Sequence, residues 1–345
     1  MNLAHLLERI ALSEPLRPAI FNGSQCVATY GQWAARSAAW AQWFDSQGFA
    51  PGDRVALFMR NHPRYLEVMF GAWWAGLVVV PINAKLHLKE MQWIVDNAQA
   101  RWAFVTSDVV PDVTALTGVQ GVTDVEQAPP WREPDGPQAL GGAPPIVPRL
   151  ADDTAWLFYT SGTTGRPKGC QLTHSNLLHE TRGAAACFPT LLRQHERLLV
   201  FLPLAHVLAR ALSMTAFANK VTLGYTSDIK NLVPMLGVFK PTIVVSVPRV
   251  FEKVYNTAEL NAQDSGRGRI FALAVKTAIA WSEAQEGSGR PNPVLRAGHA
   301  VFDRLVYGKL RAALDARLAT EKLDMSLPVV DGWEAAKQIK ANEVS

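Results

Sequence analysis

The chain has 345 residues, of which 48% are hydrophobic and 19% are charged, and its formal net charge is +4. This length and apolar content can bury the core of one large domain or two smaller ones, and they exclude disorder over most of the chain. The isoelectric point near 9.0 is mildly basic. Because no block of Lys or Arg stands out, we expect no nucleic-acid binding, and the charge suits an anionic small molecule equally well.

The N-terminal part of the chain alternates between helical and strand periodicities. Residues 31–44 place Trp33, Trp40 and Phe44 on one helical face, which predicts packing against a core. In chain order we expect a helix over 31–44, a strand over 54–59, a helix over 63–75, a strand over 77–81, a helix over 88–99 and a strand over 102–105. This order, with short joints, predicts an α/β fold in which helices flank a parallel sheet.

The apolar stretch at 66–82 is the one candidate for a membrane span. It is at the short limit of length and contains Glu67, Gly76 and Pro81. Gly76 divides it into a helix-like half and a β-branched half, which suits a helix that leads into a buried strand. We therefore expect no transmembrane segment, and peripheral contact with a membrane stays open.

A stretch dense in proline and glycine separates two parts of the chain. Residues 128–148 cannot hold regular structure, so we expect a surface connection over 128–150. We expect α/β sub-regions on either side, at 1–127 and 151–314. For the second sub-region the patterns predict strands over 154–159, 198–202 and 242–247, and helices over 175–186, 207–218, 270–284 and 293–318.

The cysteine content bears on the cellular compartment. Cys26, Cys170 and Cys187 are widely separated and form no CxxC pair, so their spacing predicts neither a zinc site nor a disulfide framework. The first residues also lack the basic-then-apolar order of a signal peptide. We therefore expect a protein of the reducing cytoplasm.

The most informative segment is residues 159–169, which read YTSGTTGRPKG. Gly162 and Gly165 let the backbone approach an anion closely and turn its N–H groups toward it. Lys168 adds a full positive charge, and Pro167 stiffens its approach. Hydroxyl groups that could donate to phosphate oxygens, or help to hold a magnesium ion, are carried by Thr160, Ser161, Thr163 and Thr164.

Other interpretations of this loop are weaker. The common P-loop needs a glycine directly before its lysine, and here that residue is Pro167. A flexible surface turn would account for the glycines but not for the whole string. The strand predicted immediately before the loop supplies the context that a phosphate-binding loop requires.

The string resembles, almost residue for residue, the phosphate-loop signature of the adenylate-forming superfamily of acyl-CoA synthetases, luciferases and peptide-synthetase adenylation domains. Two weaker segments agree in order and spacing, the WAG to VPIN segment at 74–83 and LPLAH at 202–206. The passages LPLAHVLAR and VPRVFEKVYN are similar to those of long-chain fatty acyl-CoA synthetases. The resemblance covers residues 1–314 and implies parallel sheets layered with helices, as in the N-terminal region of that fold.

The resemblance implies a two-step reaction. A fatty acid carboxylate attacks the α-phosphorus of Mg-ATP and expels pyrophosphate, and coenzyme A then displaces AMP from the acyl-adenylate. The cofactors implied are ATP, Mg²⁺ and coenzyme A, with no metal ligand identified. The nucleotide would be bound by Thr160, Ser161, Gly162, Thr163, Thr164, Gly165 and Lys168.

Three further polar residues have open interpretations. By resemblance His206 would lie near the carboxylate and act in catalysis, while a lone histidine after a strand is more often a packing or capping residue. Arg210, one helical turn later, could reach an anion or simply extend to the surface. His174, near the start of a predicted helix, is expected to be a capping or surface residue.

After Leu314 the resemblance ends. The family's SGGAPL-like turn, its magnesium-binding Y-G-x-T-E segment, its TGD segment and its mobile C-terminal domain do not appear in the sequence. We therefore expect a truncated enzyme of impaired activity or, as the alternative, a catalytically inactive nucleotide- or acyl-binding fragment. The oligomeric state stays open.

The tail at 315–345 is of a different kind. Residues 323–334, LDMSLPVVDGWE, resemble a piece of a response-regulator receiver domain, in which the residue matching Asp324 accepts phosphate. A receiver's acidic pair and its later Ser/Thr and lysine are missing, so no magnesium pocket is expected around Asp324. A phosphoreceiver-like signalling fusion is thus the weakest hypothesis, and a turn with a short helix is the plainer one.

Overall fold

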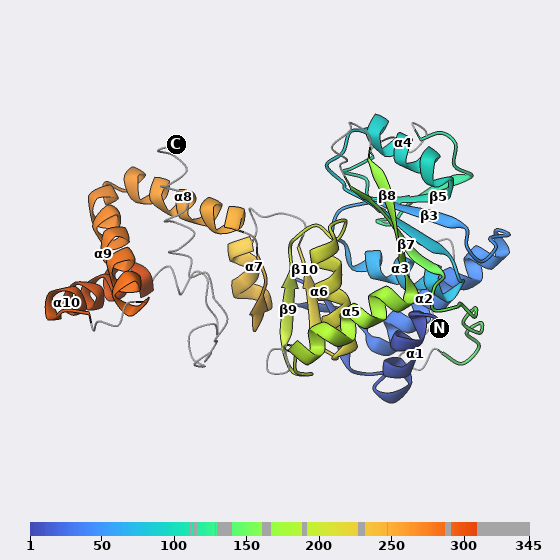
Figure 1. The fold of residues 1–345 in the computed structure, drawn as a ribbon, viewed down its shortest axis with the longest axis horizontal. Coiled ribbons are helices and arrows are strands. Elements are labelled where there is room, and N and C mark those ends of the chain that lie inside the picture. The colour runs from blue at the N-terminus through green and yellow to red at the C-terminus, as the bar shows by residue number, and fades with distance from the viewer. Residues whose placement is uncertain are drawn as a thin grey trace. The chain divides into compact units, whose positions relative to one another are not determined.

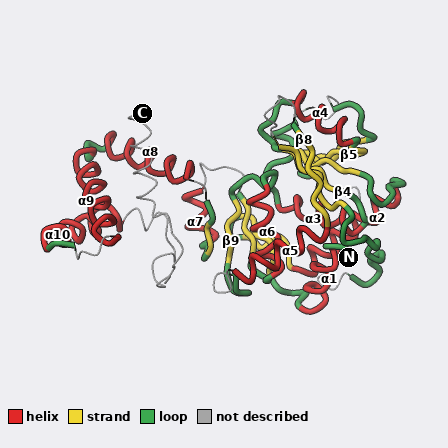
Figure 2. Tube along the Cα trace, viewed as in Figure 1, coloured by secondary structure: helices red, strands yellow, loops and turns green. Residues whose placement is uncertain are grey.

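The computed structural model describes residues 1–110, 112, 116–127, 129, 140–160, 167–187, 192–226, 232–246, 248–286 and 291–308. The contacts within the chain divide it into two compact units, Met1–Asp228 and Ile229–Ser345. Strands and helices alternate in the first unit, and helices predominate in the described part of the second (Figures 1 and 2).

The larger sheet of the first unit has the strand order β6-β5-β3-β4-β7-β8. Its neighbours pair in parallel from β6 to β7, which confirms the predicted parallel sheet, and β8 adds an antiparallel edge that the sequence did not predict. The bounds of its strands are β3 Arg54–Phe58, β4 Val78–Ile82, β5 Ala100–Val105, β6 Gly121–Asp124, β7 Thr154–Thr160 and β8 Lys168–Thr173.

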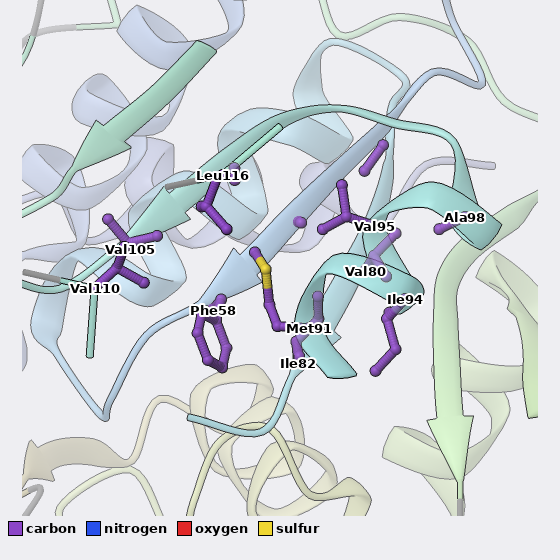
Figure 3. Packing of buried hydrophobic residues seen from close by; sticks show 13 residues of the cluster. Phe58, Val80, Ile82, Met91, Ile94, Val95, Ala98, Val105, Val110 and Leu116 are labelled. Carbon is purple, nitrogen blue, oxygen red and sulfur yellow. The ribbon is translucent and has the colours of Figure 1, made fainter. Parts of the chain in front are cut away.

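One face of this sheet is covered by α4, which spans Leu88–Ala98. The helix presents apolar side chains at helical spacing, and the strands present every second residue, so the two rows meet in one cluster. Figure 3 shows Met91, Ile94 and Val95 of the helix against Val80 and its neighbours on the strands, and all of them are buried. Because this packing fixes α4 on the sheet, it also positions residues of the helix beside β7.

The opposite face packs against α2, which spans Tyr30–Ser46. The Trp102 ring of β5 meets Trp43 with ring centroids 4.9 Å apart, and the Phe104 ring meets Trp40 at 5.2 Å. Their neighbours along β5 face α4 instead. Burial on both faces explains why the parallel strands read as nearly continuous apolar runs.

The smaller sheet of the first unit has the order β9-β10-β1-β2. Strands β9, β10 and β1 are parallel, and β2 returns antiparallel beside β1. The bounds are β1 Pro18–Asn22, β2 Gln25–Thr29, β9 Arg197–Val200 and β10 Thr222–Tyr225. Strand β1 pairs with β10 and β4 pairs with β7, so strands of the predicted sub-regions 1–127 and 151–314 lie side by side in the same sheets. The first compact unit accordingly includes the connection at 128–150 and ends at Asp228.

Helices α2, α3 (Pro63–Trp74) and α6 (Val207–Ala218) meet through an aromatic trio. The rings of Trp33, Phe70 and Phe217 contact one another edge to face, with centroids 5.0 to 5.5 Å apart. The α2–α3 crossing is close enough to require a glycine, since a Cβ at Gly71 would lie 2.5 Å from the Cβ of Trp40. Helices α1 (Ala4–Ser13) and α5 (His174–Cys187) complete the unit.

The candidate membrane stretch at 66–82 folds as predicted into the end of α3 and strand β4. Its charged residue, Glu67, is buried and pairs with Arg36 of α2 at 3.0 Å. In the part of the chain that the structure describes, no helix is long and apolar enough to cross a membrane.

The second unit contains α7 (Leu232–Phe239), β11 (Ile243–Val244), α8 (Pro248–Asp264), α9 (Gly268–Glu286), α10 (Pro293–Phe302) and a π-helical turn over Asp303–Tyr307. The strand and the two later helices were predicted, and α7 and α8 were not. The Tyr307 hydroxyl donates to the Ala274 carbonyl at 2.5 Å and its ring packs near Ala278, which ties the turn to α9. Residues 309–345, including the receiver-like tail, lie outside the described residues.

Candidate functional site

The predicted phosphate loop joins the last two strands of the larger sheet. Strands β7 and β8 pair antiparallel, with Thr160 directly opposite Lys168. Both residues are exposed, so a hydroxyl and an ammonium group stand at the two ends of the loop and can meet a ligand. The loop's other predicted site residues lie outside the described residues, namely Ser161, Gly162, Thr163, Thr164 and Gly165.

The base of the loop is fixed to α4 by Tyr159. Its hydroxyl donates to Oδ1 of Asn97 at 2.6 Å, and its ring meets Trp93 edge to face, with centroids 6.1 Å apart. Partial burial raises the pKa of the Tyr159 phenol, which keeps it a hydrogen-bond donor. Gly169 lies opposite on β8, where a Cβ would come within 3.3 Å of the Tyr159 ring. Tyr159 and Gly169, the first and last residues of the signature, therefore pack on each other, and Tyr159 also packs on α4.

The second predicted segment, residues 202–206, is a turn between β9 and α6, which we call the His206 turn. Its apolar residues Leu202, Leu204 and Ala205 are buried, whereas His206 is exposed. His206 occupies the position before the first residue of α6 but makes no side-chain capping hydrogen bond. Neither packing nor capping therefore accounts for its side chain, which can reach a ligand.

Arg210 differs from both expectations made from the sequence. It is fully buried, and its guanidinium group stacks on the rings of Trp156 and Phe158 in β7, at 4.4 and 4.7 Å from their centroids. Its Nη2 donates to the Ala205 carbonyl at 3.1 Å. Burial lowers the pKa of the Arg210 side chain to about 10, so the group stays charged at neutral pH. The arginine thus neither extends to the surface nor presents itself to an anion in solution.

Asn61 contributes to the same region and was not identified from the sequence. It follows β3, and its Nδ2 donates to the carbonyls of Leu202 at 2.9 Å and Thr226 at 3.4 Å. Its Oδ1 accepts from the backbone N–H of Leu204 at 2.8 Å. An asparagine between a strand and a proline-initiated helix gives no periodicity signal, which explains why the patterns did not reveal it.

His174 is also placed differently from the expectation of a capping or surface residue. The side chain is fully buried, its Nδ1 accepts from the backbone N–H of Leu3 at 3.3 Å, and its ring meets Trp73. Burial lowers the pKa of the imidazole from 6.5 to about 4. His174 is therefore a neutral hydrogen-bond acceptor for the backbone N–H of Leu3, and this bond connects the start of the chain to α5.

The described residues offer no preformed metal centre. Among them, no group of three or more His, Cys, Asp or Glu side chains is arranged to hold an ion. Cys26, Cys170 and Cys187 are free and exposed.

Three comparisons place the chain among known proteins. A family model described as AMP-binding enzyme matches residues 7–303. The chain is 54% identical over 284 residues to the long-chain-fatty-acid–CoA ligases FadD15 of Mycobacterium bovis and Mycobacterium tuberculosis, covering 78% of this chain and 46% of each relative. The chain thus spans less than half the length of these relatives.

Two solved structures from Mycobacterium tuberculosis resemble the fold of this chain. The inhibitor-bound N-terminal domain of FACL13 from Mycobacterium tuberculosis matches with a TM-score of 0.60 and 26% identity, over 73% of this chain and 64% of that one. A fatty acyl CoA synthetase of the same organism matches with the same TM-score and identity, over 73% of this chain and 50% of that one.

Proposed function

Because this chain belongs to the family of AMP-binding enzymes, we propose that it is the phosphate-binding part of a long-chain fatty acid–CoA ligase. The observation that carries the proposal is the 54% identity to two ligases of that class. In such a reaction a fatty acid carboxylate attacks the α-phosphorus of ATP, and coenzyme A then takes the acyl group from the adenylate. The protein's contribution is to position the reactants and neutralise charge.

The residues that would bind ATP lie around the β7–β8 loop. Thr160 and Lys168 would contact the β and γ phosphates together with Ser161, Gly162, Thr163, Thr164 and Gly165. Support comes from the exposure of Thr160 and Lys168 at paired positions, and from a hydroxyl and a cation being suitable donors to phosphate oxygens. His206 would act beside the reacting carboxylate. When bound, Mg²⁺ would neutralise phosphate charge, and the hydroxyl groups of Thr160, Ser161, Thr163 and Thr164 would help to hold it.

The alternative is that the chain binds nucleotide or acyl groups without turnover. The experiment that separates the two is fatty-acid-dependent exchange of labelled pyrophosphate into ATP by the purified chain. Exchange above that of a His206→Ala variant supports a ligase. ATP binding without exchange supports the inactive alternative.

The phosphate contacts are tested by removing the charge at Lys168. We expect Lys168→Ala to weaken ATP binding roughly tenfold, because a charge-assisted contact is lost. Lys89→Ala removes the same charge from an exposed position on α4 and serves as the matched control. Equal affinity of the two variants would remove Lys168 from the phosphate site.

Two finer parts of the proposal concern the setting of the enzyme. A cytoplasmic location agrees with three free, exposed cysteines. Peripheral membrane contact would suit a fatty acid substrate, and flotation with lipid vesicles tests it directly.

For the tail, the receiver-like hypothesis predicts labelling by acetyl phosphate that Asp324→Ala abolishes, and the plainer hypothesis predicts no labelling.

A further inference from the structure

The His206 turn is held from two sides by polar side chains of different elements, the partly buried Asn61 and the fully buried Arg210. Asn61 makes hydrogen bonds to the turn at Leu202 and Leu204, so it fixes both the carbonyl and the N–H side of the same bend. Arg210 reaches back along α6 and donates to Ala205, the residue immediately before His206. Each of these bonds ends on backbone atoms of the turn.

The same two side chains connect the turn to the larger sheet. Asn61 lies just after β3, which ends at Phe58. The guanidinium of Arg210 lies on two rings of β7, the strand that ends at Thr160. A stacked guanidinium is fixed in plane and tilt, unlike a flexible ammonium. The turn that carries His206 and the strand that leads into the phosphate loop are thus joined through one rigid group.

The burial of the Arg210 cation has an unfavourable desolvation free energy, and no carboxylate of the described residues forms an ion pair with it. Its Nε and Nη1 are buried and have no hydrogen-bond partner among the described residues, and the hydroxyl of buried Tyr65 is in the same situation. An apolar side chain would fill the space without burying a cation, but it would leave the Ala205 carbonyl unpaired. A role in orienting the His206 turn would explain why a guanidinium group occupies this buried position.

We infer that Asn61 and Arg210 are positioning residues that set His206 relative to Thr160 and Lys168, the described ends of the phosphate loop, so that one ligand can contact both segments. This inference rests on the proposed function. Neither residue touches the reacting atoms: Asn61 acts through the backbone of the turn, and Arg210 acts through Ala205 and β7. Their loss should therefore weaken binding of a ligand that spans both segments more than binding of ATP alone.

The first test measures the turn without any ligand. Hydrogen exchange of a peptide covering 201–210 is compared in the wild type, Asn61→Leu and Arg210→Met. We expect exchange there to rise about tenfold in each variant, with β3 and β4 unchanged. Arg36→Met removes another largely buried arginine, from the pair with Glu67, and should destabilise the protein without changing exchange at 201–210. Unchanged exchange in both variants, or an equal rise in Arg36→Met, would overturn the inference.

The second test uses two ligands, ATP and a long-chain acyl-sulfamoyl adenosine, a stable mimic of the acyl-adenylate. We expect each variant to bind the mimic about tenfold more weakly and to bind ATP within about twofold of the wild type. Arg210→Lys should recover part of the loss, because it keeps one donor for Ala205. Equal losses for both ligands would contradict positioning. A wild type that binds neither ligand would refute the proposed function, and the exchange experiment would still decide the roles of Asn61 and Arg210.

Discussion

The two compact units differ in how their helices are buried. In the first, α2 and α3 are enclosed by aromatic side chains, and Trp33, Trp40 and Trp73 are almost completely buried. In the second, none of the residues of α10 is buried, and Val294, Val301 and Leu305 of α10 and the following turn are more than half exposed. The candidate site residues lie in the densely packed unit. Local packing density governs local stability, so a substitution should matter far more in the first unit than in the second.

The largest expected effect is at the α2–α3 crossing. Gly71→Ala would place a Cβ 2.5 Å from the Cβ of Trp40 and 2.8 Å from the Ser37 carbonyl, and neither neighbour can move freely. We expect the free energy of unfolding to fall by about 3 kcal/mol, measured by urea denaturation. Gly183→Ala is the control, because its exposed site in α5 has no atom within 4 Å of the added Cβ. There we expect a gain of up to about 1 kcal/mol.

A second effect of similar size depends on pH. The pKa of His174 falls from 6.5 to about 4 on folding, so the unfolded chain takes up a proton first as pH decreases. Stability should be highest above pH 6.5 and should fall by up to about 3 kcal/mol as pH drops toward 4. His174→Asn keeps an acceptor for Leu3 without a titrating ring, so its stability curve should be flatter over this range. If the free energy of unfolding of His174→Asn depended on pH as steeply as that of the wild type, other titrating groups would account for the pH dependence.

The smallest effect is expected in the second unit. Tyr307→Phe removes the hydrogen bond to the Ala274 carbonyl and leaves the ring in place. We expect a loss of about 1 kcal/mol, confined to this unit and visible as faster hydrogen exchange in α9. If Tyr307→Phe destabilised the whole chain as strongly as Gly71→Ala, the contrast between the units would not hold.

The sequence predicted the elements with a strong apolar pattern, whether this was an apolar helix face or a continuous apolar run of a strand buried on both faces. Helix α6 begins and ends at the predicted residues, and α3 and β3 differ by a single residue at one end. Strand β8 was not predicted because its first four residues are exposed, so it has no apolar alternation to detect. Strand pairing across the connection at 128–150 was likewise invisible, since pairing between distant segments leaves no local pattern.

The candidate site was predicted unevenly for a related reason. A loop that binds phosphate needs particular residue types in consecutive positions, so 159–169 could be identified directly. The roles of Asn61 and Arg210 depend on backbone atoms more than a hundred residues away, or on rings of another element, and only the fold brings these together. Burial also reversed the expectation for His174, which the neighbouring residues alone did not indicate.

The antiparallel pairing of β7 and β8 has a thermodynamic consequence for nucleotide binding. Because Thr160 and Lys168 lie opposite each other in the ladder, the ends of the intervening segment are already brought together when the protein folds. The entropy lost in closing that segment is therefore part of the free energy of folding, and it does not reduce the affinity for ATP. A change that separated the two strands would move this loss to the binding step and weaken affinity even with every phosphate-contacting side chain intact.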